Sequence, residues 1–395
     1  MTAGESPITD RVFVMDWKQE KRSRISRAKR VIVKVGSAVL ASGDGLNMEM
    51  IEHLAAQLAL LHDTGRQVIL VSSGAVAAGR AAMHSRGIAT TRALPEKQAA
   101  AAIGQSRLMH AYDEAFAAYN KISAQVLLTR DDLRSRQRFL NARNTFAKLL
   151  EWGAIPVVNE NDTVVVDELK FGDNDNLSGL LLNLTEADIF VNLTSASGVY
   201  DKDPGTNADA SVMACIEDME SLDVAALCGA KTSLGSGGMH SKLLAARRAA
   251  QIGVPTYIVP GRTRGIINEV FEKPDADLGT WVRPSCKAIP SRKFWLAYNT
   301  DIAGSITIDA GAVKALLKGG KSLLPAGITG VAGNFGQGAL VKILGPESEP
   351  VGVGSCNYSA AELRRVMGKS SARNSDTETY AEAVHRDNML IHAAL

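Results

Sequence analysis

The fold is decided by residues 31–75, in which VIVKVGS (31–37) and QVILVSSGA (67–75) flank a segment with helical periodicity. Between residues 47 and 62 apolar side chains recur at helical spacing, and Gly65 follows where a left-handed C-cap is expected. The two flanking runs are rich in Val, Ile and Leu, which is typical of buried parallel strands. The stretch therefore predicts a strand, a helix and a second, parallel strand.

The same alternation continues along the chain. Four further apolar runs are separated by segments of helix length, and we expect each run to form a strand. The sequence thus predicts an α/β fold in which a mostly parallel sheet lies between helix layers. The four runs are residues 122–129, 154–162, 188–194 and 255–261.

A change of composition marks the end of this pattern. Three prolines lie close together between residues 272 and 292, without sustained periodicity, as in a linker. Beyond them, short apolar runs and many glycines predict a small β-rich, barrel-like domain. We expect an N-terminal extension at residues 1–28, an α/β domain at 29–283, and the small domain with its linker and a polar C-terminal tail at 284–395.

Composition limits the class of protein. The 395 residues are 46% hydrophobic and 22% charged, and a net charge of +2 gives no strong overall field toward nucleic acid or a membrane. The four cysteines lack a C-x-x-C pair, which argues against a zinc ribbon or a disulfide framework and favours a reducing compartment. No apolar run reaches the about 20 residues of a membrane-spanning helix, and the first residues lack the apolar core of a secretory signal. We therefore expect a cytoplasmic protein.

Polar residues follow four of the predicted strands. In an open parallel sheet, ligands bind beyond the carboxyl ends of the strands, so these positions are the first candidates for a site. All of the residues there are small, polar or charged, apart from Val35. They are Lys34 to Ser37, Ser72 to Ala75, Asn159 to Asp162, and Thr194 with Ser195.

Lys34 lies inside an otherwise apolar strand, where an unpaired ammonium group is costly to bury. It either extends to solvent from an edge strand or contacts a carboxylate or a bound anion. Gly36 favours an anion, because a glycine after the strand lets backbone amides approach a phosphate. Ser73 and Gly74 precede an alanine-rich segment, and they either cap a structural helix or bind an anion at its N-terminus.

Two segments combine acidic and amide side chains. The second, KFGDNDN at residues 170–176, fits a solvated turn. The first, NEND at residues 159–162, ends a buried strand, where a carboxylate needs a partner such as a substrate ammonium group or a metal ion. The seven histidines form no H-x-x-x-H or H-E-x-x-H pair, which argues against a protein-caged transition metal.

A glycine-rich segment at residues 235–242 precedes a predicted helix and ends on Lys242. Such a loop either binds phosphate or is a flexible surface loop. It is not a Walker A motif, no G-x-G-x-x-G follows the first strand, and no G-x-S-x-G supports a serine hydrolase. Lys34 and Lys242 together offer two cations that could flank a transferring phosphoryl group.

These motifs resemble those of the glutamate 5-kinase family, which has the amino-acid kinase fold and, in one form, a C-terminal PUA domain. The similarity extends from about residue 31 to about residue 368. VIVKVGSAVL and GSGGMHSKL resemble motifs of the wider amino-acid kinase group. NEND, GDNDNLS and the combination with a PUA-like string, SLLPAGITGVAGNFGQGALV, resemble the glutamate enzymes in particular.

The resemblance implies a role for each site residue. Lys34, Lys242 and Asp175 would be catalytic, and Asp173 or Asp175 would orient the lysines or coordinate Mg²⁺. The implied residues for ATP are Lys34, Gly36, Ser37, Thr194, Ser195, Ser236, Gly237, Gly238, Met239, His240, Ser241 and Lys242. The implied residues for glutamate are Ser73, Gly74, Asp162, Asp173 and Asn174.

The implied reaction transfers the γ-phosphoryl group of ATP, with Mg²⁺, to the side-chain carboxylate of L-glutamate, giving L-glutamyl 5-phosphate and ADP at the start of proline biosynthesis. The resemblance also implies feedback inhibition by proline, a homo-oligomer (dimer or tetramer), and a downstream glutamyl phosphate reductase. The chain departs from the family pattern at two places. Ser195 stands where an acidic residue is frequent, and the segment before Ala28 is longer than usual.

Two alternatives remain open. One is a kinase on the same scaffold that acts on acetylglutamate, aspartate, carbamate or a nucleotide, because a shared fold does not fix the acceptor. The other is an RNA-binding protein that acts through the PUA-like domain. Five basic residues there either form a binding face or an ordinary solvated surface; they are Lys314, Lys318, Lys321, Arg364 and Arg365.

Overall fold

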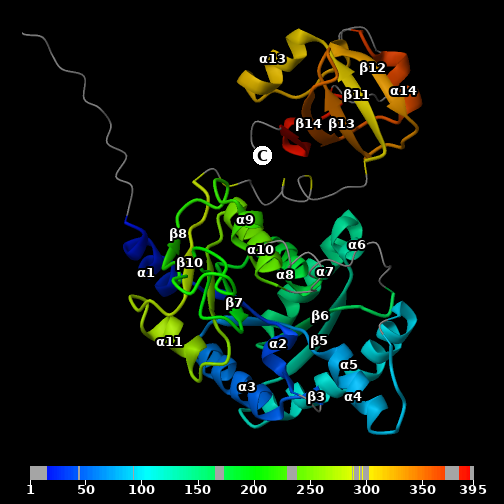
Figure 1. Ribbon diagram of the computed structural model, residues 1–395. Coiled ribbons are helices and arrows are strands. Elements are labelled where there is room, and N and C mark those ends of the chain that lie inside the picture. Colours follow the sequence, from blue (N-terminus) through cyan, green and yellow to red (C-terminus); the bar gives the residue numbers. More distant parts are fainter. Residues whose placement is uncertain are drawn as a thin grey trace, which may run out of the picture. The chain divides into compact units, whose positions relative to one another are not determined.

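A computed structural model describes residues 16–42, 45–91, 93–164, 173–228, 238–286, 302–369 and 382–391, together with Ala288, Lys293 and Leu296. Contacts divide the chain into two compact units. The first comprises residues 1–129, 144–250 and 254–284, and the second comprises residues 130–143, 251–253 and 285–395. Figure 1 labels many of the elements of both units. Domain boundaries at residues 28 and 283 stay predictions.

The first unit contains one sheet with the strand order β5-β6-β4-β1-β7-β9-β10-β8. Neighbouring strands are parallel except for the antiparallel pair β9 and β10. All six strands expected from the sequence are present, and the predicted mostly parallel α/β sheet is confirmed. The strands are β1 (Arg30–Val35), β4 (Gln67–Ser72), β5 (Ser123–Leu128), β6 (Ile155–Glu160), β7 (Ile189–Thr194), β8 (Cys215–Ile216), β9 (Thr256–Pro260) and β10 (Thr280–Val282).

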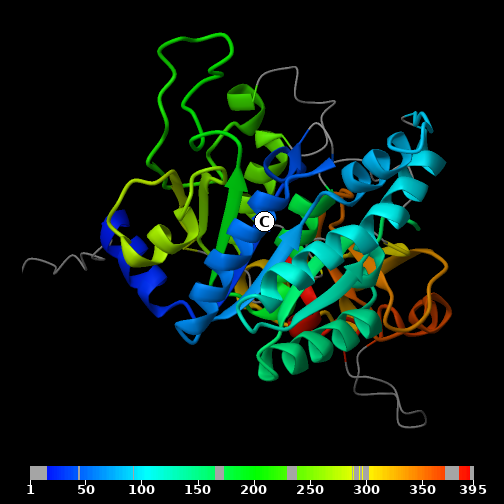
Figure 2. The ribbon, with the colours of Figure 1, turned by 90° about the horizontal axis from the view of Figure 1, so that it is seen from below.

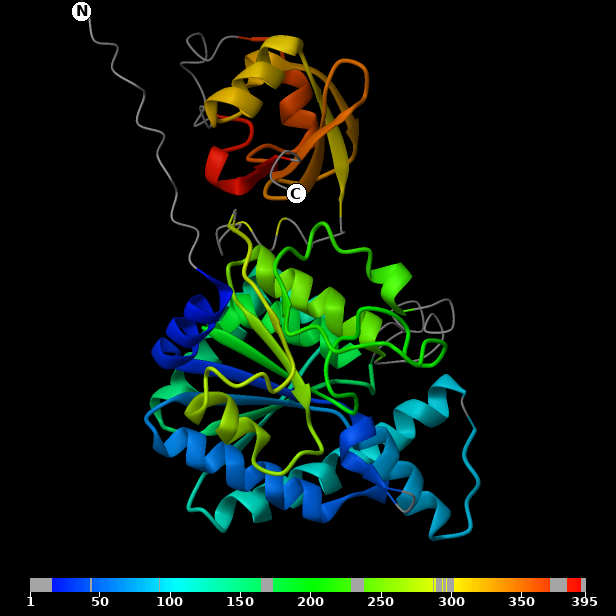
Figure 3. The ribbon, with the colours of Figure 1, turned by 60° about the vertical axis from the view of Figure 1, so that its left-hand side comes forward.

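Helices cover both faces of this sheet, as Figures 1 and 3 show. On one face α3, α5 and α11 pack against the strands, and Figure 2 views the molecule from the side of α3 and α5. Helices α8 and α10 lie on the other face. The helices of this unit are α1 (Trp17–Arg27), α2 (Ser37–Leu40), α3 (Met48–Asp63), α4 (Ala75–His84), α5 (Leu94–Ala117), α8 (Asp173–Thr185), α9 (Val224–Cys228), α10 (Met239–Gln251) and α11 (Ile266–Glu272), and a hairpin is formed by β2 (Ala41–Ser42) and β3 (Gly45–Leu46). Helix α6 (Arg130–Arg134) belongs to the second unit, and α7 (Arg136–Glu151) begins in the second unit and ends in the first.

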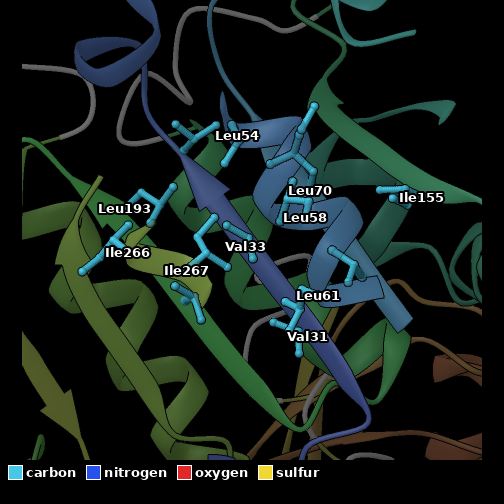
Figure 4. Packing of buried hydrophobic residues seen from close by; sticks show 14 of the residues in the cluster. Val31, Val33, Leu54, Leu58, Leu61, Leu70, Ile155, Leu193, Ile266 and Ile267 are labelled. Carbon is cyan, nitrogen blue, oxygen red and sulfur yellow. The ribbon is translucent and has the colours of Figure 1, made fainter. Parts of the chain in front are cut away.

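The helix predicted over residues 47–62 is α3. Asn47 caps it by accepting a hydrogen bond from the Met50 N–H at 3.0 Å, and Gly65 follows its end with φ of 83°. Its apolar stripe, which includes Leu54 and Leu58, packs against Val33 and other alternate residues of the strands, as Figure 4 shows. This alternation explains the core, because every second side chain of a strand faces the same helix layer.

Helix α1 packs onto the first unit, although it lies in the predicted N-terminal extension. Ile25 is fully buried in the core of that unit. Lys21 is also buried, and its ammonium group donates a hydrogen bond to the Ala276 carbonyl at 2.9 Å. Glu20 pairs with Arg283 at 2.7 Å. Residues 17–27 therefore form an integral helix of the first unit.

The second unit is β-rich, as predicted. Its five-stranded sheet has the order β12-β11-β13-β14-β15, in which only β11 and β13 are parallel neighbours. The predicted polar tail lies outside the described residues from 370 to 381. The elements are β11 (Gly304–Ile308), α13 (Ala310–Gly319), η3 (Pro325–Gly327), β12 (Ile328–Gly333), β13 (Leu340–Leu344), β14 (Pro350–Ser355), α14 (Ala360–Val366), η5 (Arg386–Asn388) and β15 (Met389–Ile391). Within the described residues, no helix has the length and apolar character needed to cross a membrane.

Candidate active site

Strand alternation sets the direction of the Lys34 side chain. Val33 and Val35 of β1 pack in the core that contains α3, so Lys34 between them faces the opposite layer. On the neighbouring strand β7, Asn192 is paired with Lys34 in the sheet register. Both side chains are buried. Two polar groups therefore lie next to each other on the face that α8 and α10 cover.

Asp175, in the first turn of α8, holds two lysines on one carboxylate. Its Oδ1 lies 2.5 Å from Nζ of Lys34, and its Oδ2 lies 3.3 Å from Nζ of Lys242 in the first turn of α10. Ser241 donates a hydrogen bond to Oδ2 at 2.6 Å, and Asn192 donates one to Oδ1 at 3.4 Å. All three charged side chains are buried: Asp175 is 1% exposed, Lys34 3% and Lys242 7%. The structure thus brings together the three residues predicted to be catalytic.

Burial and pairing have opposite effects on these charges. Burial is the largest influence on Lys34 and lowers its pKa to about 8, against the attraction of Asp175 and with the repulsion of Lys242. Burial also raises the pKa of Asp175, but the attraction of the two lysines outweighs it, and the net pKa lies below the ordinary value. Asp175 is therefore ionised at neutral pH, and the cluster has one positive charge in excess. An anionic ligand would balance it.

The pKa of Lys34 predicts an alkaline limit for the use of ATP, the nucleotide that the family resemblance implies. Above about pH 8 the free protein loses the Lys34 proton, so kcat/KM for ATP should fall up to about tenfold per pH unit. Bound phosphates stabilise the ammonium form, and kcat should therefore stay level to higher pH. Initial rates between about pH 7 and about pH 9 test this expectation. A level profile of kcat/KM for ATP across that range would contradict it.

Gly36 lies beneath the two ammonium groups. A Cβ atom at this position would lie 3.6 Å from Nζ of Lys34 and 4.0 Å from Nζ of Lys242. Because glycine has no side chain, a phosphate can approach both cations and the backbone. Ser37 follows it, begins α2 and is exposed. The predicted first phosphate loop thus lies at the lysine pair.

The second predicted phosphate loop is described in part. Ser236 and Gly237 lie outside the described residues. The Gly238 carbonyl accepts a hydrogen bond from the Ser241 hydroxyl at 2.8 Å, and α10 begins at the next residue. Of the other residues predicted to bind the nucleotide, Met239 and His240 lie in the first turn of α10. Thr194 is buried at the end of β7, and Ser195, directly after it, is exposed.

A second polar cluster lies at the carboxyl ends of β4 and β6. Asn174, in the first turn of α8, donates hydrogen bonds from Nδ2 to the Ser73 hydroxyl at 2.8 Å and to Oδ1 of Asn159 at 2.9 Å. Its Oδ1 accepts one from the Glu160 N–H at 3.2 Å. Gly74 is the N-cap of α4, with φ of 119°. Three of the residues predicted to bind glutamate, Ser73, Gly74 and Asn174, therefore lie together.

The start of α8 joins the two clusters. Successive residues of a helix project about 100° apart, so Asn174 meets Ser73 while Asp175 meets the lysines. The side chain of Asp173 lies outside the described residues. Among the residues that are described, no group of three His, Cys, Asp or Glu side chains could hold a metal ion. Because both Asp175 oxygens contact ammonium groups, Asp175 fits the lysine-orienting role better than that of a Mg²⁺ ligand.

Asp162 has a partner within the chain. Its Oδ1 lies 3.3 Å from Nζ of Lys97 on α5, and its side chain is 13% exposed. The sequence indicated a substrate ammonium group or a metal ion as the partner of this carboxylate. Lys97 was missed because its contact depends on how α5 lies against the end of β6, which no local pattern shows.

Two further site residues were missed. Asn192 contacts Asp175, and a signal for it exists, since a single amide interrupts the apolar strand IFVNLT. Gln105 on α5 accepts a hydrogen bond from Nδ2 of Asn159 at 2.8 Å. It lies in α5 among several other polar residues, and no feature of the sequence indicated a role for it. Only the tertiary arrangement shows that it belongs to the site.

Comparison with known proteins agrees with this geometry. Residues 29–260 match the amino acid kinase family, and residues 304–376 match the PUA domain. A glutamate 5-kinase of Oleidesulfovibrio alaskensis is 57% identical over 96% of this chain and 100% of its own length. Those of Nitratidesulfovibrio vulgaris (55%; 96% and 100%) and Maridesulfovibrio salexigens (54%; 94% and 98%) are similarly close. The chain therefore belongs to the amino acid kinase family, in its glutamate 5-kinase group with a C-terminal PUA domain.

Proposed function

We propose that this protein transfers the γ-phosphoryl group of ATP to the side-chain carboxylate of L-glutamate, giving L-glutamyl 5-phosphate and ADP, the first step of proline biosynthesis. One observation carries the proposal. Two buried lysines share the carboxylate of Asp175, and the preceding residue, Asn174, belongs to a separate cluster with Ser73. A cationic phosphate site and a polar acceptor site are thus built on consecutive residues of one helix.

The nucleotide occupies the cationic side. Lys34 and Lys242 contact the ATP phosphates over Gly36, and Asp175 keeps both ammonium groups in place. The loop before α10 lies at the amino end of that helix, where backbone N–H groups attract phosphate. Mg²⁺ bound to ATP would add positive charge at the phosphates. Thr194 and Ser195 lie by the nucleotide at the end of β7.

The chemistry needs charge neutralisation and alignment more than proton transfer. A glutamate side chain has an ordinary pKa of about 4.3, so the nucleophile is already ionised near neutral pH. The attacking carboxylate and the γ-phosphate repel each other. Lys34 and Lys242 reduce this repulsion and stabilise the negative charge that develops on the phosphoryl oxygens.

Glutamate occupies the acceptor side. Ser73, Gly74 and Asn174 lie at the polar cluster, and Asp173 begins the helix that carries Asn174. Asp162 binds the substrate ammonium group, with Lys97 holding its carboxylate in place. The assignments of Asp162 and Asp173 to glutamate rest on the family resemblance and on their position.

The choice of acceptor tests the proposal against other kinases of the same fold. ADP release should depend on L-glutamate and should be at least about a hundredfold slower with N-acetylglutamate, aspartate or carbamate at equal concentration. The other acceptors lack either the free ammonium group or the chain length of glutamate. Polar groups of Asp162 and of the acceptor cluster would then be left without a partner, which weakens binding. Faster ADP release with another acceptor would refute the glutamate assignment.

Replacing Lys242 should slow turnover far more than it weakens glutamate binding. In Lys242→Ala, kcat should fall about a hundredfold or more, because one of the two cations beside the transferring group is lost. The Kd of glutamate, measured by calorimetry, should change by less than about threefold, since the acceptor cluster is intact. Lys148→Ala is the control, because Lys148 forms a surface pair with Glu151. An unchanged kcat in Lys242→Ala would show that Lys242 has no role in the reaction.

Other implications of the family stay predictions. They are feedback inhibition by proline, a homodimer or homotetramer, a glutamyl phosphate reductase as the following enzyme, and a cytoplasmic location. RNA binding by the PUA domain is a separate hypothesis. Of its five basic residues, Arg364 donates a hydrogen bond to the Gly333 carbonyl at 2.6 Å, and this contact already engages it within the domain.

A further inference from the structure

Gln105 is a buried amide whose contacts lead toward the acceptor cluster. Its side chain is 9% exposed, and its Oε1 accepts a hydrogen bond from Asn159 at 2.8 Å. Its Nε2 has no partner among the described atoms. A buried donor without a partner destabilises the fold, and an apolar side chain of similar size would avoid that loss. The residue is therefore poorly explained by stability alone.

The orientations of the amides in this cluster are fixed by the backbone. The Glu160 N–H can only donate, and it donates to Oδ1 of Asn159 at 2.9 Å and to Oδ1 of Asn174 at 3.2 Å. The oxygen of each asparagine is thereby identified, and the Nδ2 of Asn159 must face Gln105. Gln105 must in turn present its oxygen. The positions of the oxygen and the nitrogen are thus defined for each of the three side-chain amides.

The orientations of these amides determine whether the Ser73 hydroxyl donates or accepts a hydrogen bond. Nδ2 of Asn174 donates to Oγ of Ser73, so this oxygen acts as an acceptor toward the protein. Within the described residues, the hydroxyl has no other hydrogen bond. Its own hydrogen is therefore left to donate to a ligand. A hydroxyl held in this way suits a carboxylate, which accepts hydrogen bonds and cannot donate them when ionised.

Helix α5 supports both strand ends of the cluster. Gln105 and Tyr112 are seven residues apart and lie on one face of the helix. Gln105 contacts Asn159 near the end of β6, and the Tyr112 hydroxyl lies 2.8 Å from Oγ of Ser72 at the end of β4. Both side chains are buried. One helix face thus fixes the two loops that carry the acceptor residues.

We propose that Gln105 is a positioning residue for the acceptor site: through Asn159 and Asn174 it holds the Ser73 hydroxyl as a donor to a carboxylate of glutamate. The proposal rests on the proposed glutamate kinase activity. Gln105 acts through its hydrogen bond with Asn159, and we expect its effect on glutamate alone. The nucleotide side, which is built on Asp175, does not depend on it.

The variant Gln105→Leu tests this role, because it removes the acceptor oxygen at similar volume and leaves Asn159 Nδ2 unpaired. KM for glutamate should rise about tenfold, while KM for ATP stays within about twofold. The matched control is Gln57→Leu. Gln57 is also buried and accepts a hydrogen bond from the Ile267 N–H at 2.9 Å, but it lies between α3 and α11. Its loss should lower Tm and leave both KM values unchanged.

A double-mutant cycle shows whether Gln105 acts through Ser73. In a Ser73→Ala background, Gln105→Leu should raise KM for glutamate by less than about twofold. Full additivity of the two effects would overturn the proposal, as would an unchanged KM for glutamate in folded Gln105→Leu. Gln105→Met is the second variant, and failure of both to fold would make Gln105 a structural residue. The wild-type assay distinguishes failure of this proposal from failure of the proposed function. If the wild-type protein releases no ADP with glutamate, the proposed function itself is wrong.

Discussion

Asp175→Asn should reduce kcat by at least about a hundredfold and destabilise the fold as well. The substitution keeps the shape of the side chain but removes the one negative charge between Lys34 and Lys242. Two buried ammonium groups would then repel each other without compensation, and breaking a buried pair in this way costs about 3 to 5 kcal/mol. The lysines would leave the geometry that transfer requires. Steady-state rates and urea unfolding measure the two effects.

The control for this prediction is an aspartate at the opposite end of β1 from Lys34. Asp188 accepts hydrogen bonds from the Lys29 and Arg30 N–H groups at 2.8 Å, where β1 begins. Asp188→Asn keeps an acceptor oxygen there, and kcat should stay within about twofold of the wild-type value. If Asp175→Asn were as active as this control, Asp175 would not organise the lysines.

Gly104→Ala should lower the free energy of unfolding by about 3 kcal/mol. In an ordinary helix the change would stabilise, because alanine has the higher helix propensity. Here α4 and α5 cross in close contact, and a Cβ at Gly104 would overlap with the carbonyl oxygen of Ala75. A Cβ at Gly79 would likewise overlap with the carbonyl oxygen of Ala100. The helices would have to separate, and denaturant unfolding measures the loss.

A helical glycine with movable neighbours provides the comparison. At Gly179 in α8, an added Cβ would lie 3.3 Å from Cδ of Arg248, a flexible side chain that can shift. Gly179→Ala should change the free energy of unfolding by less than about 1 kcal/mol. If both variants lost the same free energy of unfolding, α4 and α5 would not be packed unusually closely at Gly104. Because Gln105 follows Gly104, a separated crossing should also raise KM for glutamate.

Local patterns predicted much of this molecule. The six strands follow from apolar runs, and α3 follows from its periodicity together with Asn47 and Gly65. Lys34 was recognisable as a site residue because an ammonium group inside an apolar strand needs a partner. The sheet alternation then explains why that partner comes from the layer of α8 and α10. Lys242 was found through its glycine-rich loop.

The remainder depends on contacts between distant segments. The strand order places β1 between β4 and β7, and nothing in the individual strands specifies this arrangement. Lys97 and Gln105 reach the site only because α5 packs tightly on α4 at Gly79 and Gly104. Local propensity does not register such a crossing. The same limit applies to the ion pair between Asp162 and Lys97, which no local pattern indicates.

Identification of the product is the decisive experiment for glutamate kinase activity. The protein is incubated with ATP, Mg²⁺ and L-glutamate in the presence of hydroxylamine, which converts an acyl phosphate to a stable hydroxamate. We expect γ-glutamyl hydroxamate to form in equal amount to the ADP released. In the Asp175→Asn variant, it should form at no more than about 1% of the wild-type rate. ADP release without glutamyl hydroxamate would refute the proposed activity, because the phosphoryl group would then go to another acceptor.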